Sequence, residues 1–274
     1  MCELFAMSSA EPATISFSLH ELARHGGGTA PHKDGWGVAY YENNDVRLIR
    51  DTSCASKSPW IQFLEQQNLR SKMVMSHLRK ATDGAIAIHN TQPFARELGG
   101  RMHLFAHNGH IPTIKDCDEF VLGSFKPIGD TDSEFAFCVL LERLRSIWDG
   151  KDETPDAEQR FEIVARFAQE IGKQGLANFL YSDGELLIVH GHRRNQTDGS
   201  FRAPGLFLLQ RECSSRTVAP ESGAGIRINA PNQTVVLVAS VPLTDEAWEP
   251  LGEGDLVAIA AGEIKTWRRP EGST

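Results

Sequence analysis

The chain begins with MCELFAMS (residues 1–8), in which a cysteine follows the initiator methionine and an apolar run follows the cysteine. The apolar run at residues 4–7 predicts a first strand, which would hold the amino terminus in a sheet rather than leave it to fray. Removal of Met1 would leave Cys2 with a thiol of pKa about 8.5 and an amine of pKa about 7.7–8.0 on one residue. A nucleophile and a base would then share one tethered terminus. On its own, however, Cys2 could equally be a small buried residue at the start of a strand.

Length and charge narrow the class of protein. The 274 residues can bury a substantial core, and a formal net charge of -8 without a basic block argues against binding nucleic acid or an anionic membrane surface. The apolar runs are too short to cross a bilayer, and the amino terminus lacks the pattern of a secretory signal. We expect a cytoplasmic protein that acts on a small molecule, with residues 1–274 forming one domain.

The five cysteines are Cys2, Cys54, Cys117, Cys138 and Cys213. They are odd in number and contain no C-x-x-C pair, so they predict neither a disulfide framework nor a zinc finger.

Hydrophobic periodicity predicts strands, then two helices, then strands, which indicates an α+β layered fold. A capping box of the form T-x-x-E starts a helix at residues 131–148, and a second helix is expected at 155–173. A short helix is expected at 18–25 and loops at 212–232. Strands are expected at 35–41 and 46–49, which form a hairpin, and at 73–78, 102–107, 176–181, 186–190, 206–209, 235–238 and 256–259.

Residues that could serve an acyl transfer from Cys2 follow the short predicted strands. Asn108 and Gly109 could offer an amide and a backbone N–H to an oxyanion, although Asn-Gly is also the commonest signal for a hairpin turn. Arg79 could bind a carboxylate bidentately, or it could simply be solvated. Asp132 stands at a helix start, where it could cap the helix or receive a substrate ammonium. Together these groups describe a pocket for an α-amino acid whose side-chain acyl group is attacked.

Six segments, in order, resemble a known family: MCELFAMS, RHGGGTAPHKDGWGVAYY, SHLRKATDG, NTQPF, HNG and GDTDSE. The chain is similar to the class II glutamine amidotransferases, whose glutaminase domain is of the N-terminal nucleophile type, and SVPLTDEAWEPLGEGDLV is similar to the tail of their free-standing, YafJ-like members. The resemblance covers nearly the whole chain. It implies a four-layer αββα sandwich of the N-terminal nucleophile hydrolase type.

The resemblance also implies roles for individual residues. Cys2 would be the nucleophile, with Asn108 and Gly109 as the oxyanion hole. Arg79 would hold the glutamine α-carboxylate, Thr82 would line the same pocket, and Asp132 would receive the α-ammonium. Asp83 departs from the family pattern, because some synthases place histidine there. Trp36, between two glycines, could shape the pocket wall or belong to the core.

The implied reaction is release of glutamate and ammonia, or an amine, from glutamine or a γ-glutamyl amide through a γ-glutamyl thioester, with no cofactor and no metal. Ammonia could be received by a partner protein, or the chain could be a simple hydrolase. The alternative to an enzyme is a non-catalytic amino-acid-binding or regulatory subunit that retains the pocket.

A metal site is a third possibility, because His103, His107 and His110 stand close together in the sequence. On a strand, His103 and His107 would share a face while His110 would lie past the turn, and no carboxylate stands at a ligand-like spacing. We therefore expect no metal site at these histidines.

Overall fold

The computed structural model describes residues 2–17, 34–55, 58–82, 84–150, 153–196, 198–213, 226–230 and 232–270. The helix expected at 18–25 lies outside these residues, as do Asp83 and most of the loop segment expected at 212–232.

The first sheet has the amino-terminal strand β1 near its centre, between β13 and β4. In spatial order its strands are β14 (Glu249–Pro250), β11 (Phe207–Cys213), β13 (Gln233–Ala239), β1 (Glu3–Phe17), β4 (Arg70–Leu78), β2 (Trp36–Glu42) and β3 (Asp45–Asp51), and β12 (Ile226–Asn229) also pairs with β1. All of these pairings are antiparallel. The first strand and the 35–49 hairpin are thus confirmed.

The second sheet carries the strands that flank the two long helices in the sequence. Its spatial order is β16 (Glu263–Arg268), β15 (Leu256–Ala260), β8 (Leu187–His190), β7 (Leu176–Ser182), β6 (Arg101–His110) and β5 (Phe94–Leu98). A separate ribbon pairs β9 (Arg194–Asn195) with β10 (Phe201–Arg202).

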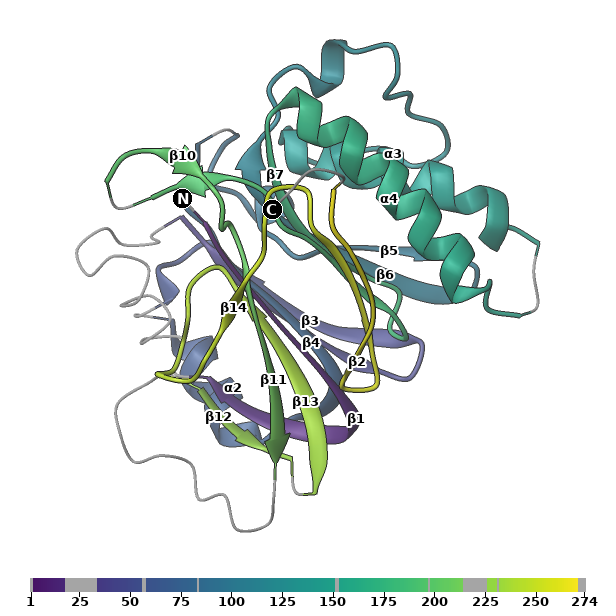
Figure 1. The fold of residues 1–274 in the computed structure, drawn as a ribbon. Coiled ribbons are helices and arrows are strands. Elements are labelled where there is room, and N and C mark those ends of the chain that lie inside the picture. The colour runs from purple at the N-terminus through teal and green to yellow at the C-terminus, as the bar shows by residue number, and fades with distance from the viewer. Residues whose placement is uncertain are drawn as a thin grey trace.

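Figure 1 shows the two sheets stacked, with α3 (Asp132–Trp148) and α4 (Ala157–Gln174) side by side on the outer face of the second sheet. The helix α2 (Pro59–Gln67) packs on the outer face of the first sheet through Ile61 and Leu64. Short 3₁₀ turns occupy Ile88–Asn90 and Ile114–Asp116. This order of layers is the α+β sandwich expected from the sequence.

The alternation of side chains along β1 accounts for the layering. Leu4 and Ala6 point into the apolar cluster between the sheets, whereas Phe5 and Met7 point into the cluster on the outer face of the first sheet. A third cluster lies between the helices and the second sheet. Because both faces of β1 are covered by apolar side chains, a slip of one residue in its register would exchange the two sets.

The helices begin where the sequence predicts. The Thr131 side chain accepts the N–H of Glu134 at 3.2 Å, which is one half of the expected capping box. The other half is absent, because the Glu134 carboxylate accepts the N–H of Gly129 at 2.6 Å and pairs with Arg96. Asp156 caps α4 through the N–H groups of Glu158 and Gln159.

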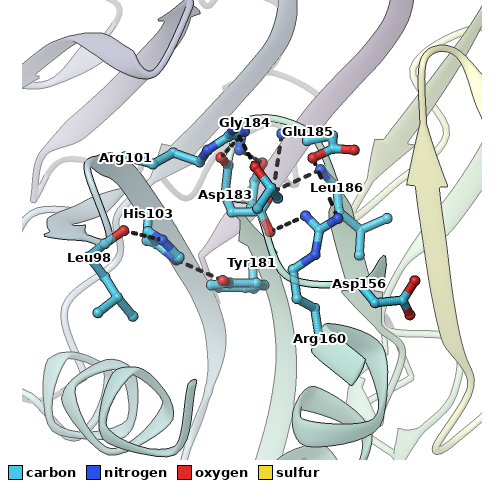
Figure 2. Close-up of polar contacts among 12 residues, drawn as sticks. Leu98, Arg101, His103, Asp156, Arg160, Tyr181, Asp183, Gly184, Glu185 and Leu186 are labelled. Carbon is cyan, nitrogen blue, oxygen red and sulfur yellow. Dashed lines mark hydrogen bonds and ion pairs between the residues drawn. The ribbon is translucent and has the colours of Figure 1, made fainter. Parts of the chain in front are cut away.

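At one end of the second sheet, a buried ion pair joins α4 to the turn between β7 and β8 (Figure 2). Arg160 Nη1 donates to Asp183 Oδ2 at 2.7 Å, and both side chains are buried. The other oxygen, Asp183 Oδ1, accepts the N–H groups of Glu185 and Leu186. The carboxylate therefore closes the turn and holds the helix at the same time.

The same end of the sandwich is bridged from sheet to sheet. The Tyr41 hydroxyl, on β2 of the first sheet, lies 2.9 Å from the carbonyl oxygens of both Met102 and Ser182 on the second sheet. In the second sheet, His103 Nε2 lies 3.1 Å from the Leu98 carbonyl and Nδ1 lies 2.7 Å from the Tyr181 hydroxyl (Figure 2). A carbonyl can only accept, so the His103 proton sits on Nε2.

No described helix is long and apolar enough to cross a membrane.

Asp183→Asn should destabilise the fold by about 3 kcal/mol, because it removes the buried charge partner of Arg160 and leaves the guanidinium with the more exposed Glu185 carboxylate, 3.4 Å away. The matched control is Asp198→Asn, since Asp198 pairs with Arg202 where both side chains are more than half exposed. Urea unfolding of the two variants should separate them clearly. Equal unfolding midpoints would contradict a stabilising role for the buried pair.

The free energy of unfolding should fall in mild acid. Burial lowers the pKa of His103 to about 4 and that of His190 to about 3, whereas in the unfolded chain both should titrate near ~6.5. Below pH ~6.5 the unfolded chain therefore binds more protons, so each histidine should cost about 1.4 kcal/mol per pH unit between pH ~6 and ~4. Urea midpoints at pH 7, 6 and 5 measure this slope. A midpoint that stays constant over this range would contradict the neutral, buried assignment.

Candidate functional site

The site begins at Cys2, which β1 and its neighbours hold in place. Leu4 N donates to Ser240 Oγ at 3.0 Å, and Ser240 N donates to the Leu4 carbonyl at 3.0 Å. On the other side of β1, Glu3 is opposite Leu78 in β4. The residue that carries the thiol is therefore fixed from both sides of the strand.

The Cys2 sulfur lies against the backbone of Lys80. Lys80 N donates to Sγ at 3.3 Å, and Sγ lies 3.4 Å from the Lys80 carbonyl. The residue is partly exposed, but the loss of water around the sulfur raises the thiol pKa, while the Lys80 backbone and the Arg79 charge oppose the shift. A thiol of this kind is protonated near neutrality, so it needs a base to act as a nucleophile.

Asn108 and Gly109 lie inside β6, so the hairpin turn considered for Asn-Gly is wrong: they are opposite Asn178 and Ala177 in β7. The Asn108 amide Nδ2 donates to the Cys2 carbonyl at 2.7 Å, which places the amide beside Cys2. The Asn108 carbonyl in turn accepts Asn178 Nδ2 at 3.1 Å.

Only glycine fits at position 109. A Cβ built there would lie 1.8 Å from the Leu176 carbonyl oxygen and 2.4 Å from His107 Nε2. The backbone of β6 therefore approaches β7 more closely than any side chain permits. This close approach fixes where the Gly109 peptide lies relative to Asn108.

Arg79 directly follows β4 and is almost completely buried, with 3 % of its surface exposed. Its Nη1 donates to the Ala85 carbonyl at 3.0 Å, and its Nη2 donates to the Gly84 carbonyl at 3.2 Å. These two bonds fix the orientation of the guanidinium. Asp34 holds the same segment, because its Oδ2 accepts the Ala81 N–H at 2.8 Å.

Asp132 is the first residue of α3, and its carboxylate reaches the end of β6. Oδ2 accepts the N–H of Ile111 at 2.7 Å, and Oδ1 accepts the N–H of Ser133 at 2.7 Å. The carboxylate is thus set by two backbone groups at a helix N-terminus, where a negative charge is favoured.

These contacts form a closed ring. Lys80 N donates to Cys2 Sγ beside Arg79, and Arg79 donates to the Ala85 carbonyl, which also accepts Asn90 Nδ2 at 3.0 Å. Asn90 Nδ2 also donates to Asp130 Oδ1 at 2.5 Å, two residues before Asp132. The ring is completed by the bond from Ile111 to Asp132 and by the bond from Asn108 to Cys2. A thiol, a guanidinium, a side-chain amide and a carboxylate, drawn from four separate segments, are thereby brought to one end of the sandwich.

The remaining predicted residues differ in their placement. Thr82 is exposed and lies three residues beyond Arg79. Asp83 is outside the described residues. Trp36 is completely buried in the cluster on the outer face of the first sheet, which corresponds to the core alternative. A role for these three in binding stays a prediction.

The three histidines considered for a metal have separate surroundings. His103 lies between Tyr181 and Leu98, whereas His107 lies between Ser133 and Leu176. His110 is half exposed and faces Asp132 at 3.6 Å. Within the described ranges, no group of three or more His, Cys, Asp or Glu side chains is arranged to hold a metal ion.

Sequence reasoning missed Ser240, Asn178 and Asp34 as supports of the site. Ser240 is 236 positions from Leu4, and no local pattern relates the two. Asn178 lies in a strand that hydrophobic periodicity explains fully. Asp34 lies within the quoted segment RHGGGTAPHKDGWGVAYY, so the resemblance pointed to this stretch. Composition and periodicity give no reason to single out Asp34 within it.

Comparisons with known proteins agree with this geometry. The sequence signature described as "Glutamine amidotransferases class-II" matches residues 1–273. The chain is 35% identical over 271 residues to the putative glutamine amidotransferase YafJ of Escherichia coli (strain K12), covering 96% of this chain and 99% of that protein.

Solved structures extend the comparison to the fold. The structure of a predicted glutamine amidotransferase from Pseudomonas aeruginosa PA01 superimposes with a TM-score of 0.67 at 31% identity, covering 96% of this chain and 99% of that one. Glutamine phosphoribosylpyrophosphate amidotransferase from B. subtilis gives a TM-score of 0.56 at 15% identity, covering 97% of this chain and 49% of that one. The expected sandwich of the N-terminal nucleophile type is confirmed.

Gly109→Ala should disrupt the site and the sheet together, because the new Cβ would overlap a backbone carbonyl. We expect a loss of about 1–3 kcal/mol in the free energy of unfolding. The matched control is Gly172→Ala in α4, whose Cβ would meet nothing closer than 3.4 Å. Gly109→Ala should unfold at lower urea and change the reactivity of Cys2 toward iodoacetamide. Gly172→Ala should keep the wild-type reactivity and unfold at the same or a higher urea concentration, because alanine favours a helix more than glycine does. A stable Gly109→Ala protein with unchanged Cys2 reactivity would show that the close approach of β6 and β7 is unimportant.

Proposed function

The chain belongs to the class II glutamine amidotransferases, and from that premise we propose that it hydrolyses glutamine or a γ-glutamyl amide through a thioester on Cys2. We further propose that residues 1–274 form one glutaminase domain, located in the cytoplasm as the sequence predicts. The observation that carries the proposal is the closed ring of contacts that links Cys2, Arg79, Asn108 and Asp132.

The first step is deprotonation of the Cys2 thiol. Because burial raises the thiol pKa, little thiolate exists near neutrality, and a base must take the proton as sulfur attacks. Once Met1 is removed, the amine of Cys2 is within reach by covalent geometry and serves as this base, directly or through one water. Removal of Met1 is therefore a condition for activity.

The second step is attack on the δ-carbonyl. A bond forms between Sγ and the carbonyl carbon, and the carbonyl oxygen takes the negative charge. Asn108 Nδ2 and the N–H of Gly109 stabilise this oxyanion, a contribution that is typically about 10²–10³ in rate for one donor. The 2.7 Å bond from Asn108 to the Cys2 carbonyl supports this role, because it holds the amide beside the residue that carries the attacking sulfur.

Collapse of the tetrahedral intermediate breaks the carbon–nitrogen bond. The protonated Cys2 amine returns its proton to the leaving nitrogen, so that ammonia or an amine departs and a γ-glutamyl thioester remains. Water, deprotonated by the same amine, then attacks the thioester, which releases glutamate and restores the thiol. No step uses a metal or a cofactor.

The substrate's amino-acid end is held by charge. Arg79 pairs with the α-carboxylate, and Asp132 pairs with the α-ammonium, so that the δ-carbonyl lies next to sulfur. Thr82 lines the same pocket in this proposal, as the resemblance implies. Backbone carbonyls orient the Arg79 guanidinium and backbone N–H groups orient the Asp132 carboxylate, which supports this role because both charged groups are held in fixed positions.

The acceptor of the nitrogen is open to experiment. Amidophosphoribosyltransferase of Synechococcus elongatus is 26% identical over 155 residues, which are only 29% of its length. A partner protein could take the ammonia here, or the chain could be a free hydrolase. Glutamate release from glutamine and from a panel of γ-glutamyl amides, with and without candidate partner proteins, separates the two.

Cys2→Ala should abolish glutamate release, lowering kcat by at least about 10³-fold, because the nucleophile and its covalent intermediate are lost. The matched control is Cys213→Ala, since Cys213 is also partly buried and its thiol pKa is likewise raised. Intact-mass spectrometry should find Met1 removed and a glutamine-analogue electrophile attached at Cys2 alone. Full activity in Cys2→Ala would favour the alternative of a binding or regulatory subunit.

A further inference from the structure

The Asp132 carboxylate is surrounded by donors that could compete with a substrate ammonium. Its Oδ1 lies 2.7 Å from Ser133 N and 3.1 Å from Ser133 Oγ, and its Oδ2 lies 2.7 Å from Ile111 N. The two backbone N–H groups are fixed. The Ser133 hydroxyl is different, because its single proton can point either toward Oδ1 or away from it.

His107 determines where that proton points. Its Nε2 lies 3.0 Å from the Leu176 carbonyl and its Nδ1 lies 2.8 Å from Ser133 Oγ. The carbonyl can only accept, so Nε2 carries a proton. The ring is buried, and burial lowers its pKa, so the imidazole is neutral and Nδ1 presents a lone pair. Nδ1 must therefore accept the Ser133 proton.

The direction of the Ser133 proton determines how many hydrogen bonds the Asp132 carboxylate accepts within the protein. With the Ser133 proton directed at His107, the 3.1 Å approach between Ser133 Oγ and Asp132 Oδ1 has no hydrogen between the two oxygens. Two lone-pair-bearing oxygens at this distance repel each other weakly, and a cation near them relieves the repulsion. Asp132 Oδ1 then keeps its full capacity to accept an ammonium.

We propose that His107 is a positioning residue: by accepting the Ser133 proton, it holds the Asp132 carboxylate open for the α-ammonium of the substrate. The inference rests on the proposed function, in which Asp132 binds that group. His107 directly precedes Asn108 in β6, so one strand carries the oxyanion donors and also sets the state of the ammonium site.

The test is a double-substitution cycle. In His107→Phe a planar, slightly larger ring is kept but both ring nitrogens are lost, so the Ser133 hydroxyl should turn and donate to Asp132 Oδ1. We expect KM for L-glutamine to rise about ten- to a hundredfold, the value of a hydrogen bond to a charged group, with kcat changed much less. Ser133→Ala removes the hydroxyl and should leave KM near the wild-type value.

The double variant distinguishes positioning from simple structural damage. With no hydroxyl left to mask Asp132, His107→Phe/Ser133→Ala should recover most of the KM lost in His107→Phe. His107→Gln, whose amide can donate to Leu176 and accept from Ser133, should also stay close to wild type. If the double variant is as impaired as His107→Phe or more so, the proposal is wrong. Should His107→Phe fail to fold, His107→Met takes its place in the cycle.

A substrate without the α-amine supplies the second readout. Glutaramate has the carboxylate and the δ-amide of glutamine but no ammonium, so its KM should not respond to His107→Phe. Equal increases in KM for glutamine and glutaramate would overturn the inference, since the effect would not then pass through Asp132.

A binding measurement on catalytically inactive variants tests this inference separately from the proposed catalytic reaction. Calorimetry measures L-glutamine binding without turnover in three proteins: Cys2→Ala, Cys2→Ala/His107→Phe and Cys2→Ala/His107→Phe/Ser133→Ala. The differences among them report the ammonium contact. Binding that weakens and recovers as predicted supports the inference even if wild-type protein releases no glutamate, which would contradict the proposed function alone. Binding unaffected by His107→Phe would contradict this inference and leave the proposed function standing.

Discussion

The pairing of β1 on both of its edges is the constraint on which the rest of the site depends. A terminus that is not tied into a sheet frays, and a frayed nucleophile has no fixed position relative to its substrate. Here the exchange of hydrogen bonds between Leu4 and Ser240 fixes one edge, and β4 fixes the other. The two apolar faces of the strand then forbid a slip in register. The position of Cys2 is therefore set by the core, not by the loops around it.

Backbone groups orient the two charged side chains of the candidate site. The Arg79 guanidinium donates to the carbonyls of Gly84 and Ala85, and the Asp132 carboxylate accepts the N–H groups of Ile111 and Ser133. The Arg160–Asp183 pair differs, because there a guanidinium and a carboxylate of the protein bind each other and both side chains are buried. Under the proposed function the first arrangement positions groups for a zwitterion, whereas the second stabilises the fold.

The sequence could predict the features that depend on neighbours along the chain. The two long helices, the 35–49 hairpin and the central strands follow from periodicity and capping, and the structure confirms them. What failed depends on distant contacts. Asn108-Gly109 has the local signal of a turn, but the pairing of β6 with β7 overrides it, and the glycine is explained by the Leu176 carbonyl across the sheet. The short α2 and the strand β5 were missed, because neither has a long enough periodic pattern to stand out.

The candidate site residues also divide into those that local motifs could indicate and those that depend on contacts between distant segments. Motif order was sufficient to name Cys2, Arg79, Asn108, Gly109 and Asp132, which the structure brings together, whereas Trp36 lies in the core. Motifs could not reveal that His107 and Ser133 meet, since that contact needs α3 to dock on β6. The strands β6 and β7 separate the two polar ends of the second sheet: Asn108 is opposite Asn178 at one end, and Leu104 is opposite Ser182 at the other. Only a few residues of each strand separate the two ends, at a rise of about 3.3 Å per residue. Aromatic and aliphatic side chains are buried along this stretch. The buried ion pair and the candidate site therefore occupy opposite ends of one antiparallel pair of strands, so a substitution at Asp183 can weaken the fold without touching Cys2, whereas one at Gly109 cannot alter the sheet without altering the site.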